Sequence, residues 1–380
     1  MKVLHTIPGL NISSGGPSFC TYNLLKGLRK QNLEVDILTL FPNNSFDQII
    51  GNDDFIKLAP NNTYTSFAYN RSFKFFLKQN TQYDLYHANT IWCYPTHATL
   101  HHAQKRNIPC IITPHGMLYP QALKISAWKK KIALPLFQLK DLKMTTCLHA
   151  TCMPELQYFR AAGLTNPVAI VQNCLNIDKS ETPHETLNSK KRFGFVGRLH
   201  RIKNLDGLLY AWSKLNKLTE NAELIVIGGG NDTVYEEEIR RVISLFNIRN
   251  ISFTGFLTGE SLAGVIRSLD FLVLPSHSEN FGMVVPEALV KGIPVIASKG
   301  TPWEELNTHR CGWWVENDVD KLAATIEAAI NTPENLRREM GENGRKLVIE
   351  NYSMEVVAKK MIRLYKWILE GGEKPEFVYI

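Results

Sequence analysis

Short β-rich apolar runs alternate with longer helical patterns along this chain, and the alternation starts again near its middle. Such alternation is typical of βαβ units, in which crossover helices join parallel strands. In the first half the pattern predicts strands at 2–7, 35–40, 85–88, 110–113 and 168–171, the last of which closes the domain. The helix that follows the first strand is expected from Pro17 to Lys30. The fold class is therefore α/β, with two Rossmann-like domains whose parallel sheets face each other across a cleft.

The second half begins after a polar stretch at 178–191, which contains Pro183, lacks periodicity and is the best linker candidate. Expected elements are strands at 192–196, 224–227, 251–253, 271–274 and 294–297, and helices at 204–215, 234–246, 259–268 and 286–291. The tail from Pro333 to about Glu370 is predicted to be helical and to stop at Gly371. We expect domains at 1–177 and 192–352, followed by a final helix at 353–370.

Length and composition agree with two packed domains. A chain of 380 residues exceeds what one core usually serves, and 44% apolar with 21% charged residues excludes disorder. No apolar run is long enough to span a bilayer and the start resembles no signal peptide, so we expect a cytoplasmic protein. Seven scattered cysteines without a Cys-x-x-Cys pair indicate reduced, buried thiols. The net charge of +7 admits an anionic partner, although no motif indicates nucleic acid.

The strongest chemical signal is HSENFGMVVPEALVKG at 277–292, which follows the apolar run 271–274. We expect Glu279 in a loop at a strand's carboxyl end, and Glu287 in the first turn of a helix near Pro286. Backbone N–H groups suited to polar or anionic ligand atoms are those of Phe281, Gly282 and Met283. A first-turn carboxylate can also accept two ribose hydroxyls. The structural alternative is that Glu287 complements the helix dipole and Glu279 is a solvated loop residue.

A second signal is the basic turn after the strand at 192–196. Gly197 ends that strand, and Arg198 and Lys203 flank the turn into the next helix. A guanidinium fork with a mobile ammonium forms a clamp for a diphosphate, which would neutralise a leaving nucleoside diphosphate without a metal. A solvated basic loop is the alternative, and the position at a strand end favours phosphate binding. Asp318-Val319-Asp320 spells Asp-x-Asp but is expected to cap a helix.

The first half contributes two weaker signals. Gly15 and Gly16 open the first helix and would let amides approach a phosphate, although a plain turn is the ordinary explanation. Neither Gly-x-Gly-x-x-Gly nor a Walker motif occurs, which disfavours dehydrogenases and P-loop enzymes. His115 follows the strand at 110–113 and can hydrogen-bond a sugar hydroxyl or modulate developing charge. A lone histidine is usually structural, but this position favours the cleft.

The segment 121–143 carries six lysines and one acid, interleaved with apolar residues and Trp128. A basic amphipathic stretch of this kind suits an anionic membrane surface or a lipid-diphosphate acceptor. A solvated helix that covers the first domain explains the pattern equally well.

Several short segments, taken together and in their order along the chain, resemble those of the retaining GT-B glycosyltransferases of glycosyltransferase family 4. The E-x7-E pattern of that family corresponds here to Glu279 and Glu287. The resemblance runs through Gly15-Gly16, TPHG at 113–116, VGRL at 196–199, GGG at 228–230, Phe281-Gly282 and PEA at 286–288. Gln172-Asn173-Cys174 departs from the Pro-Asn-Gly that relatives often carry there. The segments 301–305 and 311–314 resemble members from surface-polysaccharide clusters.

The resemblance implies that Arg198 and Lys203 hold the donor diphosphate, that Glu287 binds the ribose and that Glu279 addresses the donor sugar. The implied donor-binding residues are Gly15, Gly16, Arg198, Lys203, Gly255, Phe256, Glu279, Phe281, Gly282, Met283, Val284 and Glu287. The implied catalytic residues are His115, Glu279, Arg198 and Lys203. Gly255 and Phe256 would lie against the nucleobase. The resemblance also implies that the final helix at 353–370 crosses back to the first domain. No metal or other cofactor is implied.

The expected function is retaining transfer of a hexose-type sugar from a nucleotide-diphosphate sugar to a glycan or polyprenyl-linked acceptor in polysaccharide or lipopolysaccharide assembly. The sequence does not specify the nucleobase, the sugar or the acceptor. Two alternatives stay open: a glycosidase that uses Glu279 and Glu287 as its carboxylate pair, and a non-catalytic nucleotide-sugar-binding partner on the same fold.

Overall fold

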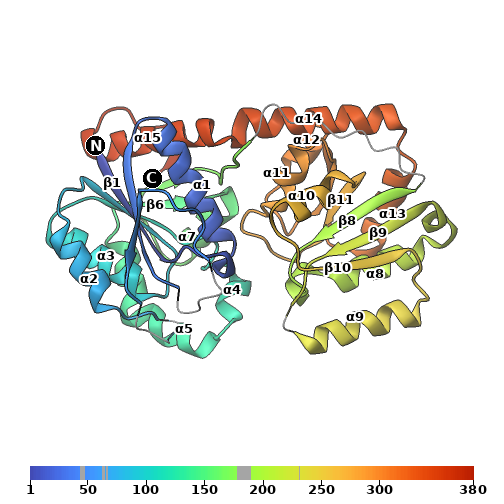
Figure 1. Ribbon diagram of the computed structural model, residues 1–380, viewed down its shortest axis with the longest axis horizontal. Helices are drawn as coiled ribbons and strands as arrows, with labels where there is room; N and C mark the ends of the chain where they lie inside the picture. The colour runs from blue at the N-terminus through green and yellow to red at the C-terminus, as the bar shows by residue number, and fades with distance from the viewer. Residues whose placement is uncertain (43–47, 62–64, 66, 178–189, 231) are drawn as a thin grey trace. The chain divides into compact units, whose positions relative to one another are not determined.

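The computed structural model describes the chain except residues 43–47, 62–64, 66, 178–189 and 231, so most of the predicted linker lies outside the described residues. Contacts divide the chain into two compact units. Unit 1 comprises residues 1–176 and 352–380, and unit 2 comprises residues 177–351. Each unit is a twisted sheet with helices on its faces (Figure 1). The predicted α/β class is confirmed.

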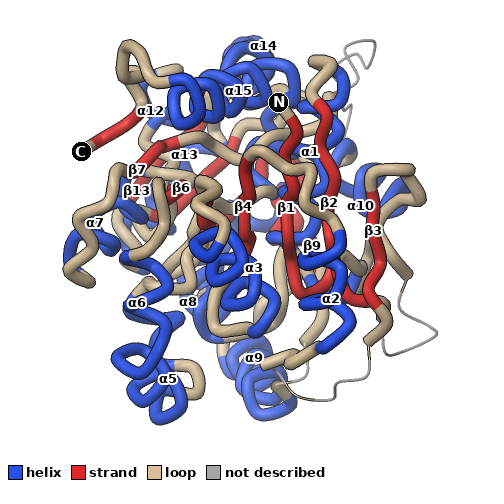
Figure 2. Tube along the Cα trace, turned by 90° about the vertical axis from the view of Figure 1, so that its left-hand side faces the viewer, coloured by secondary structure: helices blue, strands red, loops and turns tan. Residues whose placement is uncertain are grey.

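Unit 1 is built on an eight-stranded sheet of order β14-β7-β6-β5-β4-β1-β2-β3, which Figure 2 shows with its helices. Its strands are β1 (Lys2–Gly9), β2 (Glu34–Leu40), β3 (Ile56–Ala59), β4 (Leu85–Asn89), β5 (Cys110–Thr113), β6 (Cys147–Ala150), β7 (Val168–Ile170) and β14 (Val378–Tyr379). Its helices are η1 (Ile12–Ser14), α1 (Gly16–Lys30), α2 (Arg71–Gln79), α3 (Tyr94–Lys105), α4 (Pro120–Lys124), α5 (Ala127–Ala133), the π-helical turn η2 (Leu134–Gln138), α6 (Leu139–Lys143), α7 (Met153–Ala161) and α15 (Met354–Glu370).

Unit 2 has a six-stranded parallel sheet of order β10-β9-β8-β11-β12-β13. Its strands are β8 (Lys191–Val196), β9 (Ala222–Ile227), β10 (Ile251–Gly255), β11 (Phe271–Leu274), β12 (Val295–Ser298) and β13 (Gly312–Val315). Its helices are η3 (Arg201–Lys203), α8 (Leu205–Lys214), η4 (Asn216–Asn221), α9 (Thr233–Leu245), α10 (Gly259–Arg267), α11 (Val284–Leu289), α12 (Glu305–Thr308), α13 (Val319–Ile330) and α14 (Glu334–Tyr352).

Both sheets have a topological switch point, where the strand order reverses. In unit 1 the reversal lies between β1 and β4, and in unit 2 it lies between β8 and β11. Loops that follow the two strands beside such a point diverge to opposite faces of the sheet and leave a crevice at its carboxyl edge. The switch points therefore identify where each unit is suited to hold a ligand.

The C-terminal helix α15 is part of the core of unit 1. It packs on α1, where a Cβ added to Gly27 would lie 2.8 Å from the Met354 carbonyl oxygen and 3.3 Å from the Ala358 Cβ. Met354, Val357, Ala358, Met361, Leu364 and Tyr365 of α15 are buried in the same cluster as residues of β1 and β2. The absence of a side chain at Gly27 thus allows two helices from opposite ends of the chain to meet closely.

The tail differs from the single helix predicted for 333–370. It breaks at Ser353, whose ψ of 148° is extended. The break has a physical cause: Leu175 N–H donates to the Tyr352 carbonyl at 2.8 Å, and Met354 N–H donates to the Leu175 carbonyl at 3.0 Å. Pairing with this distant segment takes Ser353 out of the helix. Gly371, with φ 77°, ends α15 as predicted.

The edge of the first sheet also differs from the prediction. The strand predicted at 168–171 is present as β7, but β14 pairs with it in antiparallel fashion and forms the edge instead. Strands β3, β6, β13 and β14 were not predicted. All seven cysteines are free and buried, as expected. Within the described residues, no helix is both long and apolar enough to cross a bilayer.

Candidate functional site

The switch point of unit 2 brings Lys203 and Glu279 together. Lys203 ends η3 in the loop after β8, and Glu279 lies in the loop after β11. Lys203 Nζ and a Glu279 carboxylate oxygen form an ion pair, and the two side chains are only 19% and 13% exposed. A cation and an anion that are buried to this extent strongly favour the paired state unless a ligand replaces one partner. The sequence placed both residues at strand ends but did not predict that they pair.

Several bonds fix Glu279 in its loop. Ser276 Oγ donates to the same carboxylate oxygen at 2.8 Å, and Glu279 N–H donates to the Gly300 carbonyl at 2.9 Å. A Cβ at Gly300 would lie 2.3 Å from the Ser276 carbonyl oxygen, so only glycine fits there. His277 N–H donates to the Ile202 carbonyl at 2.8 Å and ties this loop to the lysine's turn. The pair is therefore built on two connected, rigid loops.

The loop at 281–283 is held by Trp303, which sequence reasoning did not assign to the site. The indole Nε1–H of this buried tryptophan donates to the Phe281 carbonyl at 2.5 Å, and the two rings meet edge-on at 5.1 Å. Gly282 has φ 78°, a conformation that favours glycine. Met283 and Val284 follow at the start of α11, two residues earlier than the helix predicted at 286–291. The signal for Trp303 was available in the segment 301–305.

Glu287 occupies the first turn of α11, as predicted. Its side chain is half-buried and, within the described part of the chain, accepts no hydrogen bond. Burial raises the pKa of Glu287 to about 7, and Lys291 counteracts the rise. A dehydrated carboxyl group without a donor gains most from a ligand that supplies hydroxyl groups.

Arg198 is exposed at the turn after β8 and forms no ion pair within the described residues. The Lys203 stem runs over Gly197, whose added Cβ would lie 3.6 Å from it. Gly228 approaches the same turn so closely that a Cβ there would overlap the Gly197 carbonyl oxygen. The basic turn and the glycine loop after β9 therefore lie against each other, with the Arg198 guanidinium free to reach a ligand.

Gly255 ends β10 and Phe256 follows it at the same edge of the sheet. Gly228 N–H donates to the Gly255 carbonyl at 2.9 Å, and a Cβ at Gly229 would lie 3.9 Å from the Phe256 Cβ. The Phe256 ring is 72% exposed. Unit 2 thus gathers all its predicted site residues at the carboxyl ends of β8, β10 and β11. The predicted Asp-x-Asp cap is also confirmed, because the Asp318 side chain accepts from two backbone N–H groups of α13.

In unit 1, Gly15 and Gly16 lie at the start of α1, beside the switch point. Gly15 has φ 77° and needs glycine for that reason. Gly16 is exposed and helical, and a Cβ there would meet nothing within 4 Å. Among the described residues, no neighbour therefore explains the missing side chain at Gly16.

A chain of buried hydrogen bonds runs beneath His115 and starts at the Val171 carbonyl. A carbonyl only accepts, so His149 donates to it from Nε2 at 2.7 Å and accepts on Nδ1 from Thr113 Oγ1, also at 2.7 Å. Thr113 then accepts from His87 Nε2 at 2.7 Å, and His87 Nδ1 accepts from the Tyr365 hydroxyl at 2.8 Å. Burial lowers the pKa of His149 to about 4 and that of His87 well below its ordinary value. Both rings are therefore neutral at pH 7.

The same chain continues from Tyr365 to His115. The Tyr365 oxygen accepts from His5 Nε2 at 2.9 Å, and His5 Nδ1 accepts from Asn89 Nδ2 at 3.3 Å. Asn89 Nδ2 also donates to the Thr6 carbonyl, so Asn89 Oδ1 is the atom that faces His115 Nε2 at 3.3 Å. Burial lowers the pKa of His115 to about 3. His115 is therefore neutral, carries its proton on Nε2 and offers Nδ1 as an acceptor.

Glu155, which sequence reasoning missed, holds the turn that carries His115. His115 and Gly116 both have positive φ, at 54° and 74°. The buried Glu155 carboxylate accepts from Gly116 N–H at 2.6 Å and from Thr151 N–H at 2.9 Å. Burial raises the pKa of Glu155 to about 7, against the lowering effect of these bonds. No local sequence signal distinguishes this glutamate from a surface one.

Two family models together match most of the chain. Residues 14–179 match the model described as Glycosyltransferase Family 4, and residues 176–347 match the one described as Glycosyl transferases group 1. The HepE protein of Anabaena, crystallised with UDP and glucose, superimposes with a TM-score of 0.74 at 17% identity over 96% of this chain and 99% of that one. The chain has the GT-B glycosyltransferase fold.

Curated relatives agree with this assignment. An uncharacterized glycosyltransferase of Methanocaldococcus jannaschii is 29% identical over 53% of this GT-B chain, and the match spans only 55% of that relative's length. The O-antigen chain mannosyltransferase C of Escherichia coli is 23% identical over 98% of this chain and 100% of its own length. The glycosyltransferase domains are thus present in both halves.

Proposed function

We propose that the chain is a retaining glycosyltransferase of family 4, which transfers a hexose-type sugar from a nucleotide-diphosphate sugar to a glycan or polyprenyl-linked acceptor in polysaccharide or lipopolysaccharide assembly. The observation that carries the proposal is the Lys203–Glu279 pair at the switch point of unit 2, with Arg198 in the same turn as Lys203 and Glu287 in the helix that follows the Glu279 loop. HepE, which binds UDP and glucose, and the O-antigen mannosyltransferase support the donor and acceptor classes.

In the proposed reaction, the donor diphosphate takes over Lys203 from Glu279 and gains the Arg198 fork. The two cations stabilise the charge that grows on the diphosphate as the bond between the anomeric carbon and the phosphate oxygen breaks. The acceptor oxygen forms the new bond from the same face, and its proton passes to the departing phosphate oxygen. Glu279, once released from Lys203, accepts from sugar hydroxyls together with the backbone of 281–284. No step requires a metal.

Unit 1 would contribute a neutral acceptor and open backbone amides. Since His115 offers Nδ1, we propose that it receives a hydrogen bond from a hydroxyl of the transferred sugar. A Cβ added at Gly16 would meet nothing within 4 Å, so the space beside this residue is open. We propose that the Gly16 amide approaches the diphosphate there. The exposed ring of Phe256 would stack on the nucleobase.

Donor binding at pH 7 is expected to release up to about half a proton per donor, because Glu287 has a pKa of about 7 and is about half ionised there. Ribose hydroxyls that donate to this carboxylate favour its charged form and lower its pKa. Calorimetric titrations in two buffers of different ionisation enthalpy measure the release. The Glu287→Gln variant should bind the donor more weakly and without the proton release. Equal proton release in the variant would contradict the ribose assignment.

We also propose that segment 121–143 contacts an anionic membrane surface. Trp128, Ile132 and Leu136 are strongly exposed on α5 and η2, and three consecutive lysines at 129–131 lie between the first two. Exposed aromatic and aliphatic side chains among lysines are the combination that interfacial helices use.

A panel of nucleotide sugars tests the proposed function. The purified protein is screened by thermal shift with UDP-, GDP- and ADP-linked hexoses, since a bound donor must raise the melting temperature. Each stabilising donor is then tested with glycan and polyprenyl-diphosphate acceptors, and the anomeric coupling of the product is read by NMR. Transfer with the donor's configuration is expected. Inversion would contradict retention, donor binding without transfer would favour a non-catalytic partner, and hydrolysis of an aryl glycoside would favour a glycosidase.

A further inference from the structure

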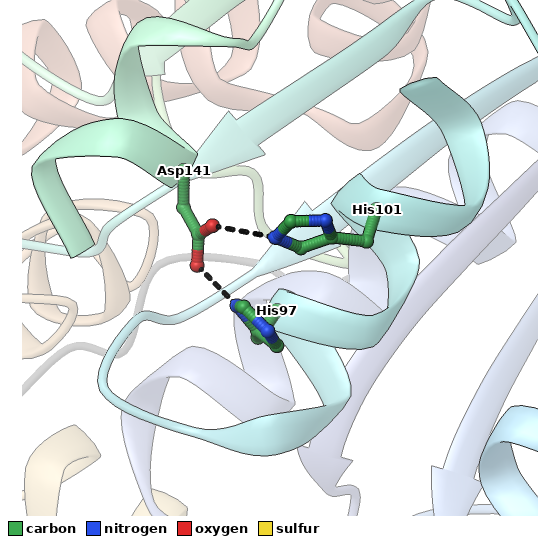
Figure 3. Close-up of side chains that lie close together, drawn as sticks. All are labelled: His97, His101 and Asp141. Carbon is green, nitrogen blue, oxygen red and sulfur yellow. Dashed lines mark hydrogen bonds and ion pairs between the residues drawn. The ribbon is translucent and has the colours of Figure 1, made fainter. Parts of the chain in front are cut away.

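Two histidines of α3 face one aspartate of α6 in unit 1, far in sequence from the proposed donor-binding residues. His97 and His101 lie one helical turn apart and point from the same face of α3 toward Asp141 (Figure 3). His97 Nδ1 is 2.8 Å from Asp141 Oδ2, and His101 Nε2 is 3.3 Å from Asp141 Oδ1. One nitrogen or oxygen atom from each of the three lies within 4.8 Å of the others.

The environment of Asp141 indicates a cation site. Its side chain is only 1% exposed, yet its Oδ1 atom has no hydrogen-bond donor in suitable geometry. Within the described residues, Asp141 pairs with these two imidazoles and with no lysine or arginine. A buried carboxylate oxygen without a donor is costly, and a bound metal ion removes that cost.

The two imidazoles are arranged to share one cation. Their ring centroids are 4.3 Å apart, so two protonated rings would repel each other strongly. Two neutral rings each provide a lone pair. Phe137 meets the His97 ring edge-on at 5.7 Å and limits its rotation. A metal ion between the three side chains would replace the hydrogen bonds to Asp141 without exposing the carboxylate.

We propose that His97, His101 and Asp141 bind a divalent transition-metal ion of the zinc type. Two imidazole nitrogens and one carboxylate oxygen form a donor set that Zn²⁺ accepts, and three protein ligands leave a fourth position for water. Tetrahedral coordination with bonds of about 2.0–2.1 Å requires ligand atoms roughly 3.3 Å apart, which small side-chain rotations achieve. The ion would join α6, at the end of the segment 121–143, to α3.

Cobalt and zinc titrations of the full-length protein test this site. After removal of metal with a chelator, Co²⁺ should bind at one equivalent and give the visible absorption of a tetrahedral nitrogen and oxygen site, without the intense thiolate band that cysteine ligation would add. Zn²⁺ should displace it, raise the melting temperature and slow hydrogen exchange in peptides that cover 121–143.

Variants decide between a metal site and a plain ion pair. His101→Asn and Asp141→Asn should each weaken Zn²⁺ binding at least tenfold, whereas His309→Asn, at an exposed histidine of unit 2, should not. Because His101 is partly exposed, its variant is expected to fold, and circular dichroism checks this. Unchanged binding in His101→Asn, thiolate absorption, or no stoichiometric binding by the wild type would overturn the proposal.

Discussion

Lys203→Met is expected to weaken binding of the nucleotide-sugar donor by about 2 to 5 kcal/mol, or from about 30-fold to several thousand-fold. The lysine side chain is only 19% exposed, so a diphosphate at this position is largely desolvated. Loss of the ammonium leaves both the phosphate and Glu279 without their cation. The turnover rate should fall as well, because the same charge stabilises the leaving group. Donor titration calorimetry and kcat/KM measure the two effects.

Two further variants separate the phosphate contact from a general charge effect. Lys214→Met removes an exposed lysine that pairs with Asp320, and it should leave donor affinity unchanged. The double variant Lys203→Met, Glu279→Gln removes the uncompensated carboxylate but does not restore the cation. Its affinity for the donor should remain severely reduced. Near-normal donor affinity in the double variant would show that Lys203 serves only to neutralise Glu279.

Acidification from pH 7.5 to 5 is expected to destabilise unit 1 by about 5 kcal/mol. Burial holds the pKa values of His5 and His115 at about 3 and that of His149 at about 4, and places that of His87 well below its ordinary value. An unfolded histidine takes up a proton near pH 6.5 and a folded one here does not, so stability falls below that pH, by roughly 2 kcal/mol per histidine at pH 5. Glu155 acts in the opposite direction.

The compensation by Glu155 follows from its raised pKa of about 7. The folded state holds a proton on this carboxyl group that the unfolded state loses above pH 4.5. As the pH falls from 7, Glu155 therefore stabilises unit 1 and offsets the destabilisation caused by about one histidine. Hydrogen exchange at pH 7.5 and 5 measures the balance. Protection should fall in peptides of β1, β4, β5 and β6, and it should persist in β8, β9 and β11 of unit 2, whose described histidines, His200, His277 and His309, are exposed. Equal protection of unit 1 at both values would contradict a neutral histidine chain.

The sequence predicted the fold best where structure is local. The run Phe271–Leu274 was predicted with its observed bounds because a parallel strand buried on both faces is a continuous apolar run. The break at Ser353 could not be predicted, because its cause is pairing with Leu175, which lies far away along the chain. Strand β6 was missed because CLHA is short and contains a histidine whose hydrogen-bond partners are on other elements.

The candidate site shows the same limit. Lys203 and Glu279 could be identified because each follows a recognisable strand, and strand ends meet at one edge of a parallel sheet. Their ion pair, the support from Trp303 and the role of Glu155 depend on contacts between distant segments. Tyr365 is the clearest case: it belongs to the last helix of the chain, yet its hydroxyl completes the hydrogen bonds that fix the protons of His5 and His87.

The most direct test of the account is a crystal structure of the protein with UDP or GDP bound. We predict that the diphosphate contacts the Arg198 guanidinium and Lys203 Nζ, that the Lys203–Glu279 pair has opened, and that the Glu287 carboxylate accepts from the ribose hydroxyls. A nucleotide bound elsewhere, with the Lys203–Glu279 pair intact, would contradict it.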